Sequence, residues 1–121
     1  MRVDWSEYLR VHANRRNLLI HLVAVPLFVV AALTLSVALM TGNPVSAITS
    51  LVFALFAMVL QGRGHRLEAN PPRPFTGPGN FLRRWFTEQF VIFPVFVLSG
   101  RWIDQYRKST SQSENPARHE S

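Results

Sequence analysis

The apolar stretch Leu18–Met40 constrains the fold more than any other part of the chain. It runs for 23 residues, and only His21, Thr34 and Ser36 interrupt its apolar character. A helix of about 20 apolar residues crosses the hydrocarbon core of a bilayer, so this stretch is long enough to span one. Pro26 lies inside it, and membrane helices tolerate an internal proline, usually as a kink, better than soluble helices do. The stretch therefore predicts a transmembrane helix.

A second apolar run, Val45–Leu60, follows the uncharged turn Thr41–Pro44. The run is short for a span, but Gln61 can extend its helix to about Arg63. Asn17 stands just before the first run and is the expected N-cap of that helix. The two runs predict a transmembrane helical hairpin, and with it an all-α fold for a small integral membrane protein.

Shorter elements flank this hairpin. Residues Asp4–Asn14 have the helical spacing of an amphipathic helix at a membrane interface. The segment Gly62–Arg84 is polar and rich in Pro and Gly, so we expect an ordered loop there, with a new helix that starts near Asn80. The third apolar stretch, Trp85–Trp102, has too short an uncharged part for a simple span, so we expect a helix that is re-entrant or packed on the hairpin. Residues 1–107 are expected to form one helical membrane domain, and residues 108–121 a disordered polar tail.

The basic residues lie at the ends of the apolar runs. The chain has 13 Lys and Arg, 7 Asp and Glu and a formal net charge of +6. Chains this basic bind nucleic acid or an anionic membrane surface. Because the arginines cluster at span ends rather than along one polar face, we expect membrane lipid as a partner and no nucleic acid. The turn Thr41–Pro44 has no basic residue, so the positive-inside tendency places the N-terminus and the 62–84 loop in the cytoplasm.

Three of the four histidines fall at one membrane level in this topology. His12 precedes the first span, His21 lies about one turn inside it, and His65 follows the second span. The chain has no cysteine, so a metal site would use imidazole and carboxylate ligands, which suit Fe(II), Zn(II) or Mn(II). The alternative is that each histidine is a hydrogen-bonded residue at a helix end.

The spacing of the first two histidines limits how they can meet. On one straight helix, residues nine positions apart lie about 13 Å apart along the axis and on opposite faces. A shared metal therefore requires a break in the helix between His12 and His21, and the segment Asn14–Asn17 is the expected place. Gln61 and His65 are spaced to share one face of a helix, and Glu68 follows closely.

Two motifs flank the apolar hairpin and together resemble a known enzyme family. They read Tyr8-x3-His12-x4-Asn17-x3-His21-x4-Pro26, and then Gln61-x2-Gly64-His65 with Glu68, Pro71 and Pro72 close behind. This pairing resembles the fungal 2-hydroxy fatty acid dioxygenase family and its bacterial relatives, over roughly Tyr8–Gly100.

The resemblance implies a membrane enzyme that holds non-haem Fe(II) and uses neither haem nor 2-oxoglutarate. Such an enzyme uses O2 to cleave a 2-hydroxy long-chain fatty acid to the acid one carbon shorter and CO2. His12, His21 and His65 would be the iron ligands, near the cytoplasmic face of a bacterial inner membrane or the endoplasmic reticulum. Gln61 and Glu68 match motif positions and are the predicted catalytic-site residues, although Glu68 follows His65 by three residues where the family has four.

Other charged residues near the motifs are candidates for binding substrate. Arg63 or Arg66 could pair with the substrate carboxylate through a bidentate contact, and the alternative is that both anchor the protein at the membrane surface. Glu88 lies near the start of the third apolar stretch and needs a partner there. It would be a further metal ligand, a group that supports the ligands, or an ion-pair partner of Arg83 or Arg84.

Two other functions fit the same sequence. One is a non-catalytic small membrane protein, a lipid-binding or assembly factor, in which the histidines are structural. The other is a basic adaptor at a membrane surface. An oligomer is compatible with each of these functions. Bound metal and O2 consumption would distinguish the dioxygenase from both.

Overall fold

The computed structural model describes residues 3–114, with side chains described up to Ser109. This part of the chain is helical and contains no strand, which confirms the expected all-α class. Its elements are α1 (Trp5–Arg10), α2 (Arg15–Thr41), α3 (Pro44–Arg66), α4 (Pro78–Thr87), the π-helical turn η1 (Glu88–Ile92), α5 (Phe93–Leu98) and α6 (Arg101–Glu114).

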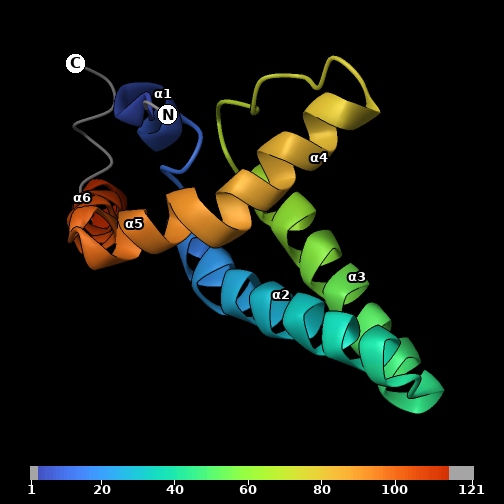
Figure 1. Cartoon of the computed structure of the whole chain (residues 1–121). Coiled ribbons are helices and arrows are strands. Elements are labelled where there is room, and N and C mark those ends of the chain that lie inside the picture. The colour runs from blue at the N-terminus through green and yellow to red at the C-terminus, as the bar shows by residue number, and fades with distance from the viewer. Residues whose placement is uncertain (1–2, 115–121) are drawn as a thin grey trace.

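The two long helices α2 and α3 form the antiparallel hairpin (Figure 1). Gly42 ends α2 with a left-handed backbone (φ 67°), a conformation that glycine adopts at no steric cost. The Asn43 side chain then accepts a hydrogen bond from the backbone N–H of Ser46 and caps α3, whose first residue is Pro44. An N-cap, a proline at the first helical position and a C-terminal glycine together explain why the turn falls here.

Small residues line the contact between the two long helices. Ala31, Ala54 and Ala57 are buried there beside Phe28, and small side chains let membrane helices approach closely. The outer faces are apolar and exposed, as at Met40, which is 85% exposed. Both helices are long and apolar enough to cross a membrane. The architecture is that of a small all-α membrane protein.

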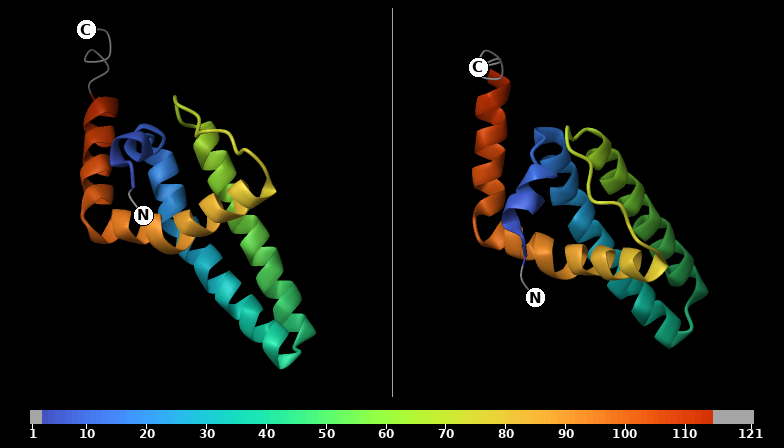
Figure 2. Two further views of the ribbon diagram at one scale, coloured as in Figure 1. Left: turned by 45° about the horizontal axis from the view of Figure 1, so that its top comes forward. Right: turned by 90° about the horizontal axis from the view of Figure 1, so that it is seen from above.

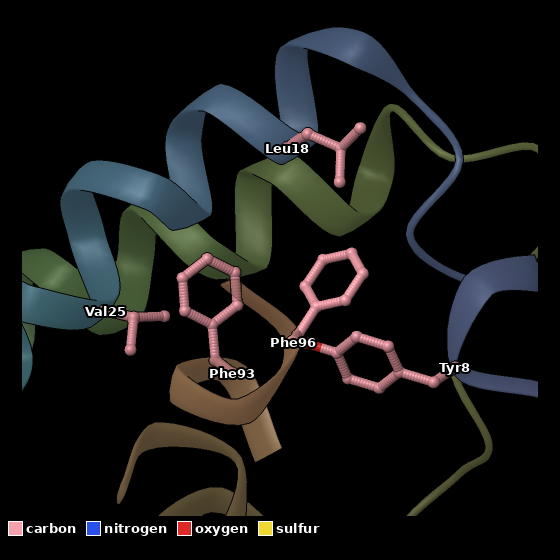
Figure 3. Packing of buried hydrophobic residues seen from close by; sticks show 5 residues of the cluster. All are labelled: Tyr8, Leu18, Val25, Phe93 and Phe96. Atoms are coloured by element: carbon pink, nitrogen blue, oxygen red, sulfur yellow. The ribbon is translucent and has the colours of Figure 1, made fainter. Parts of the chain in front are cut away.

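The third apolar stretch packs on the hairpin, one of the two arrangements expected for it. Helix α4, the turn η1 and helix α5 follow one another as a single rod, which lies across the half of the hairpin away from the Gly42 turn (Figures 1 and 2). Phe93 and Phe96 of this rod are buried against Leu18 and Val25 of α2 and against Tyr8 of α1 (Figure 3). This cluster fixes α1 and α5 over the N-terminal end of α2.

The helix break expected between the first two histidines is present, but it lies earlier in the chain. Helix α1 ends at Arg10, and Asn14 caps α2 by accepting hydrogen bonds from the backbone N–H groups of Arg16 (2.9 Å) and Asn17 (3.2 Å). The break therefore covers residues 11–14. The expectation that Asn17 is the N-cap was wrong, because Asn14 reaches the free N–H groups of the first turn and Asn17 is already helical.

Helix α6 turns back along α1 after the left-handed Gly100 (φ 85°). The Trp102 indole N–H donates to the Leu18 carbonyl (3.2 Å), and the Gln105 amide donates to the carbonyls of Leu9 and His12. This helix continues to Glu114, across the position 107 where we expected the domain to end. The rest of the expected tail, residues 115–121, lies outside the described residues.

Candidate metal centre

Three histidines from three different segments meet at the open end of the hairpin. His12 lies in the break after α1, His21 in α2 and His65 in the last turn of α3. Their ring centroids are 5.1 Å apart for His12 and His21, 4.8 Å for His12 and His65, and 4.7 Å for His21 and His65. One nitrogen from each ring lies within 4.8 Å of the other two. The structure thus brings together the three side chains that the sequence placed at one membrane level.

Hydrogen bonds to the backbone determine which nitrogen of each ring faces its neighbours. His12 Nδ1 is 2.9 Å from the Tyr8 carbonyl, and His21 Nδ1 is 3.0 Å from the Asn17 carbonyl. A carbonyl only accepts, so both Nδ1 atoms donate and both Nε2 atoms keep a lone pair. The His65 ring makes a hydrogen bond to the backbone of Val11.

The remaining ring nitrogens are buried without a partner. They are His12 Nε2, His21 Nε2 and His65 Nδ1. A buried polar atom without a hydrogen bond is costly, and three such acceptors side by side have no donor among them. Ligand histidines in metal sites have this pattern, in which one ring nitrogen binds a backbone carbonyl and the other binds the metal. The donor set fits a divalent cation.

His12, which lies outside the two long helices, is uncharged in this setting. Burial lowers the pKa of His12 well below its usual value, and the neighbouring His21 and His65 lower it further. A neutral imidazole is the form that binds a metal. The same burial therefore favours metal binding by His12 and disfavours an ion pair between protonated His12 and Glu88.

Glu68 ties the end of α3 to the break that separates His12 from His21. Its Oε1 accepts hydrogen bonds from the backbone N–H groups of Ala13 (2.9 Å) and Asn14 (2.7 Å), and its Oε2 accepts one from the Asn17 side chain (2.5 Å). The Asn14 side chain donates back to the Leu67 carbonyl. Burial raises the pKa of Glu68, and these hydrogen bonds oppose the shift. Both oxygens of this predicted catalytic residue are thus engaged at the break.

Gly64 lets α3 approach α2 beside these histidines. A Cβ atom added at this position would lie 2.2 Å from Asn17 Oδ1 and 3.4 Å from Ile20 Cγ2. Asn17 cannot easily withdraw, because it is fully buried and hydrogen-bonded to Glu68. The glycine of the second motif is therefore required by packing.

Gln61 forms a buried pair with Gln89 of η1. Each amide N–H donates to the other side chain's carbonyl, at 2.8 and 2.7 Å, and both residues are almost fully buried. The pair connects α3 to the π-helical turn, four residues before His65. Sequence reasoning missed Gln89, and its one signal was a polar side chain inside an apolar stretch.

Glu88, the first residue of η1, lies beside the histidines. The Tyr8 hydroxyl donates to Glu88 Oε1 (2.8 Å), and the same oxygen is 3.7 Å from His12 Nε2. Burial raises the pKa of Glu88 to about 7, and the hydrogen bond from Tyr8 opposes the shift. No salt bridge within residues 3–109 joins Glu88 to Arg83 or Arg84. The described residues therefore do not support the expected ion pair of Glu88 with Arg83 or Arg84.

A cavity of about 1100 Å³ adjoins His12 and His65 of this group. Its polar wall includes His12, His65, Gln61, Glu88 and Arg66. Most of the remaining lining is apolar and includes Met58, Phe81, Trp85 and Ile92. Of the two arginines predicted to bind substrate, Arg66 lines this cavity and Arg63 does not.

Comparison with known families identifies the chain. The family described as 2-hydroxy-palmitic acid dioxygenase Mpo1-like matches residues 1–98. The chain belongs to this Mpo1-like family. The match extends from the N-terminus to the end of α5, so it includes all three histidines and confirms the resemblance drawn from the paired motifs. Neither the curated proteins nor the solved structures contain a match to the Mpo1-like chain.

Proposed function

We propose that this chain is a non-haem Fe(II) dioxygenase of the membrane that acts on 2-hydroxy long-chain fatty acids. One 2-hydroxy acid and one O2 give the acid one carbon shorter, CO2 and water. The observation that carries the proposal is a group of three histidines that offer one ring nitrogen each within 4.8 Å of one another. Each ring also has a buried nitrogen without a partner, and a largely apolar cavity adjoins the group. Membership of the Mpo1-like family supplies the reaction class.

The three histidines are the proposed iron ligands. Their neutral nitrogen donors suit a borderline metal such as Fe(II) better than Mg(II) or Ca(II), which prefer oxygen. When bound, iron would supply the one-electron chemistry that O2 requires. The protein's part is to hold three rings in fixed tautomers, through the carbonyls of Tyr8 and Asn17 and the hydrogen bond at Val11.

Glu68 and Gln61 are proposed to position these ligands. The hydrogen bonds of Glu68 hold residues 11–14 outside the helix, and the break lets His12 and His21 face each other. The Gln61–Gln89 pair holds η1 against α3, one helical turn from His65. If either contact were lost, the three histidines would still be present, but their rings would no longer be oriented toward one metal.

The cavity suits an amphipathic acid. A 2-hydroxy fatty acid has a polar head and a long apolar chain, and the cavity has polar and apolar walls to match. Arg66 is the proposed partner of the substrate carboxylate, since a guanidinium pairs with a carboxylate through two hydrogen bonds. The volume of about 1100 Å³ is slightly above the range of about 300–1,000 Å³ that is usual for small-molecule sites. Arg63 does not line the cavity and is the proposed anchor at the membrane surface instead.

The two long helices would anchor the enzyme in the bilayer that dissolves its substrate. The basic residues around the open end of the hairpin favour a cytoplasmic orientation of the metal centre. A bacterial inner membrane or the endoplasmic reticulum fits this topology. Apolar substrate would then reach the cavity from the membrane rather than from water.

The test is metal analysis and O2 uptake on detergent-purified protein. We expect one iron per chain, and O2 uptake with 2-hydroxyhexadecanoate but not with hexadecanoate, which lacks the hydroxyl. Chelation should abolish uptake, and Fe(II) should restore it while Zn(II) does not. Folded protein that binds no metal and consumes no O2 would contradict the proposal and favour a non-catalytic membrane protein.

A further inference from the structure

The carboxylate of Glu88 faces an imidazole nitrogen that has no proton to share. His12 donates its Nδ1–H to the Tyr8 carbonyl, so its Nε2 carries a lone pair. The Tyr8 hydroxyl donates to Glu88 Oε1. That oxygen and His12 Nε2 are 3.7 Å apart. With Glu88 ionised, two acceptors face each other with no donor between them, an arrangement that a cation would stabilise.

The distance between these two atoms fits ligands of one metal. Two donors, each about 2.1 Å from a metal and at right angles, lie about 3 Å apart. The group with donor atoms within 4.8 Å of one another consists of the three histidines, and Glu88 stands next to it, 3.7 Å from His12. To share a metal with all three histidines, the Glu88 side chain would turn from His12 toward His21 and His65.

The π-helical turn η1 explains how Glu88 reaches this position. A π turn adds a residue to the helix and changes the direction of the side chains on either side of it, and such turns are frequent at functional sites. Glu88 and Gln89 are consecutive, and each has a specific partner: Tyr8 holds Glu88 and Gln61 holds Gln89. Glu88 also lines the cavity beside His12 and His65. Contacts from α1 and α3 thus hold the Glu88 carboxylate beside His12.

We propose that Glu88 is a fourth protein donor to the metal, and that Tyr8 is the positioning residue that orients it. This inference rests on the proposed function, since it requires that the three histidines bind a metal. The carboxylate adds one negative charge to an otherwise neutral set of protein ligands. It thereby strengthens the binding of a divalent cation and favours it over a monovalent one.

The test is Co(II) binding to metal-free protein in detergent, followed by visible absorption. We expect Glu88→Gln to raise the Kd for Co(II) at least tenfold and to shift the absorption bands, because one ligand is lost. Tyr8→Phe should raise the Kd a few fold with the band positions kept, because the carboxylate is still present. Asp104→Asn is the matched control, since it removes one negative charge from an exposed position on α6 and should change neither quantity.

Three results would overturn the proposal. An unchanged Kd in Glu88→Gln would overturn it, and so would a raised Kd with unchanged bands, because the charge would then act from outside the ligand set. Both results leave the histidine centre intact. Wild-type protein that binds no Co(II) would overturn the proposed function as well.

A measurement on the wild-type chain covers the case in which Glu88→Gln does not fold. Protein labelled with 13C-glutamate should show a shifted carboxylate band in the infrared difference spectrum when Co(II) is added. A spectrum without such a shift would contradict a glutamate ligand.

Discussion

The two ends of the α2–α3 hairpin bury different kinds of side chain. Near the Gly42 turn the outer faces are apolar and exposed, including Met40 and Val45, and Ala38 is buried. At the open end, by contrast, Asn17, His21 and Gln61 are no more than 1% exposed. Helices α1 and α6 and the rod from α4 to α5 cover only this open end (Figure 2).

The turn end thus suits contact with lipid, and the open end has the polar groups of the candidate site. Exposed apolar side chains cost little where lipid surrounds them, so the turn end needs no covering elements. Buried polar groups cost free energy unless each has a partner. At the open end the amides of Gln61 and Gln89 and the carboxylate of Glu68 are paired. The three imidazole nitrogens are left unpaired, and this surplus of acceptors supports the proposed metal centre.

The largest effect is expected from His21→Ala at the open end. Loss of one of three nitrogen donors should lower metal affinity by at least 100-fold, because imidazole is a strong ligand in this set. Metal content by mass spectrometry and the helical signal by circular dichroism check this together. His119→Ala is the control, since the sequence does not group this histidine with the other three. Equal metal content in both variants would contradict the histidine centre.

Gly64→Ala should destabilise the fold, and Gly62→Ala should not. The new Cβ at position 64 would meet Asn17 Oδ1 at 2.2 Å, while a Cβ at position 62 meets nothing within 4 Å. Overpacking of this kind costs about 1–3 kcal/mol, whereas an open helical position gains about 0.5–1 kcal/mol from Gly to Ala. Unfolding in mixed micelles measures both. Equal stability would mean that α3 and α2 are not in close contact here.

Glu68→Ala should destabilise the conformation of residues 11–14 more than Glu68→Gln does. Alanine leaves the N–H groups of Ala13 and Asn14 and the amide of Asn17 without an acceptor, at a cost of about 1–2 kcal/mol. Glutamine keeps one oxygen for the two backbone groups, and Asn17 can turn its own oxygen toward the new amide. Hydrogen exchange at Ala13 and Asn14 reports on the break itself. Unchanged exchange in Glu68→Ala would show that another contact holds residues 11–14.

The smallest effect is expected at the turn end, for Val37→Ala. Val37 is 59% exposed, so the change should alter the free energy of unfolding in detergent by less than about 0.5 kcal/mol. The same unfolding measurement used for the glycines checks it. A loss of about 2 kcal/mol would match the truncation of a buried side chain, and it would indicate that a second copy of the chain covers this face.

Hydropathy alone predicts the hairpin well. The expected runs, Leu18–Met40 and Val45–Leu60, lie inside the observed helices Arg15–Thr41 and Pro44–Arg66. The helix ends are less predictable, because Asn14 and Asn17 are both suitable caps. Only the backbone around the break decides that Asn14 caps α2.

The sequence by itself determined the two apolar helices, the basic end and the three histidines at one level. These follow from the cost of placing polar groups in hydrocarbon, which acts on each residue separately. Only the tertiary structure decided the partners of the polar residues. Tyr8 meets Glu88 across 80 positions of the chain, and Gln61 meets Gln89 across 28. Such contacts depend on how α1 and the π-helical turn dock on the hairpin, and that docking comes from packing around Phe93 and Phe96 rather than from any local pattern.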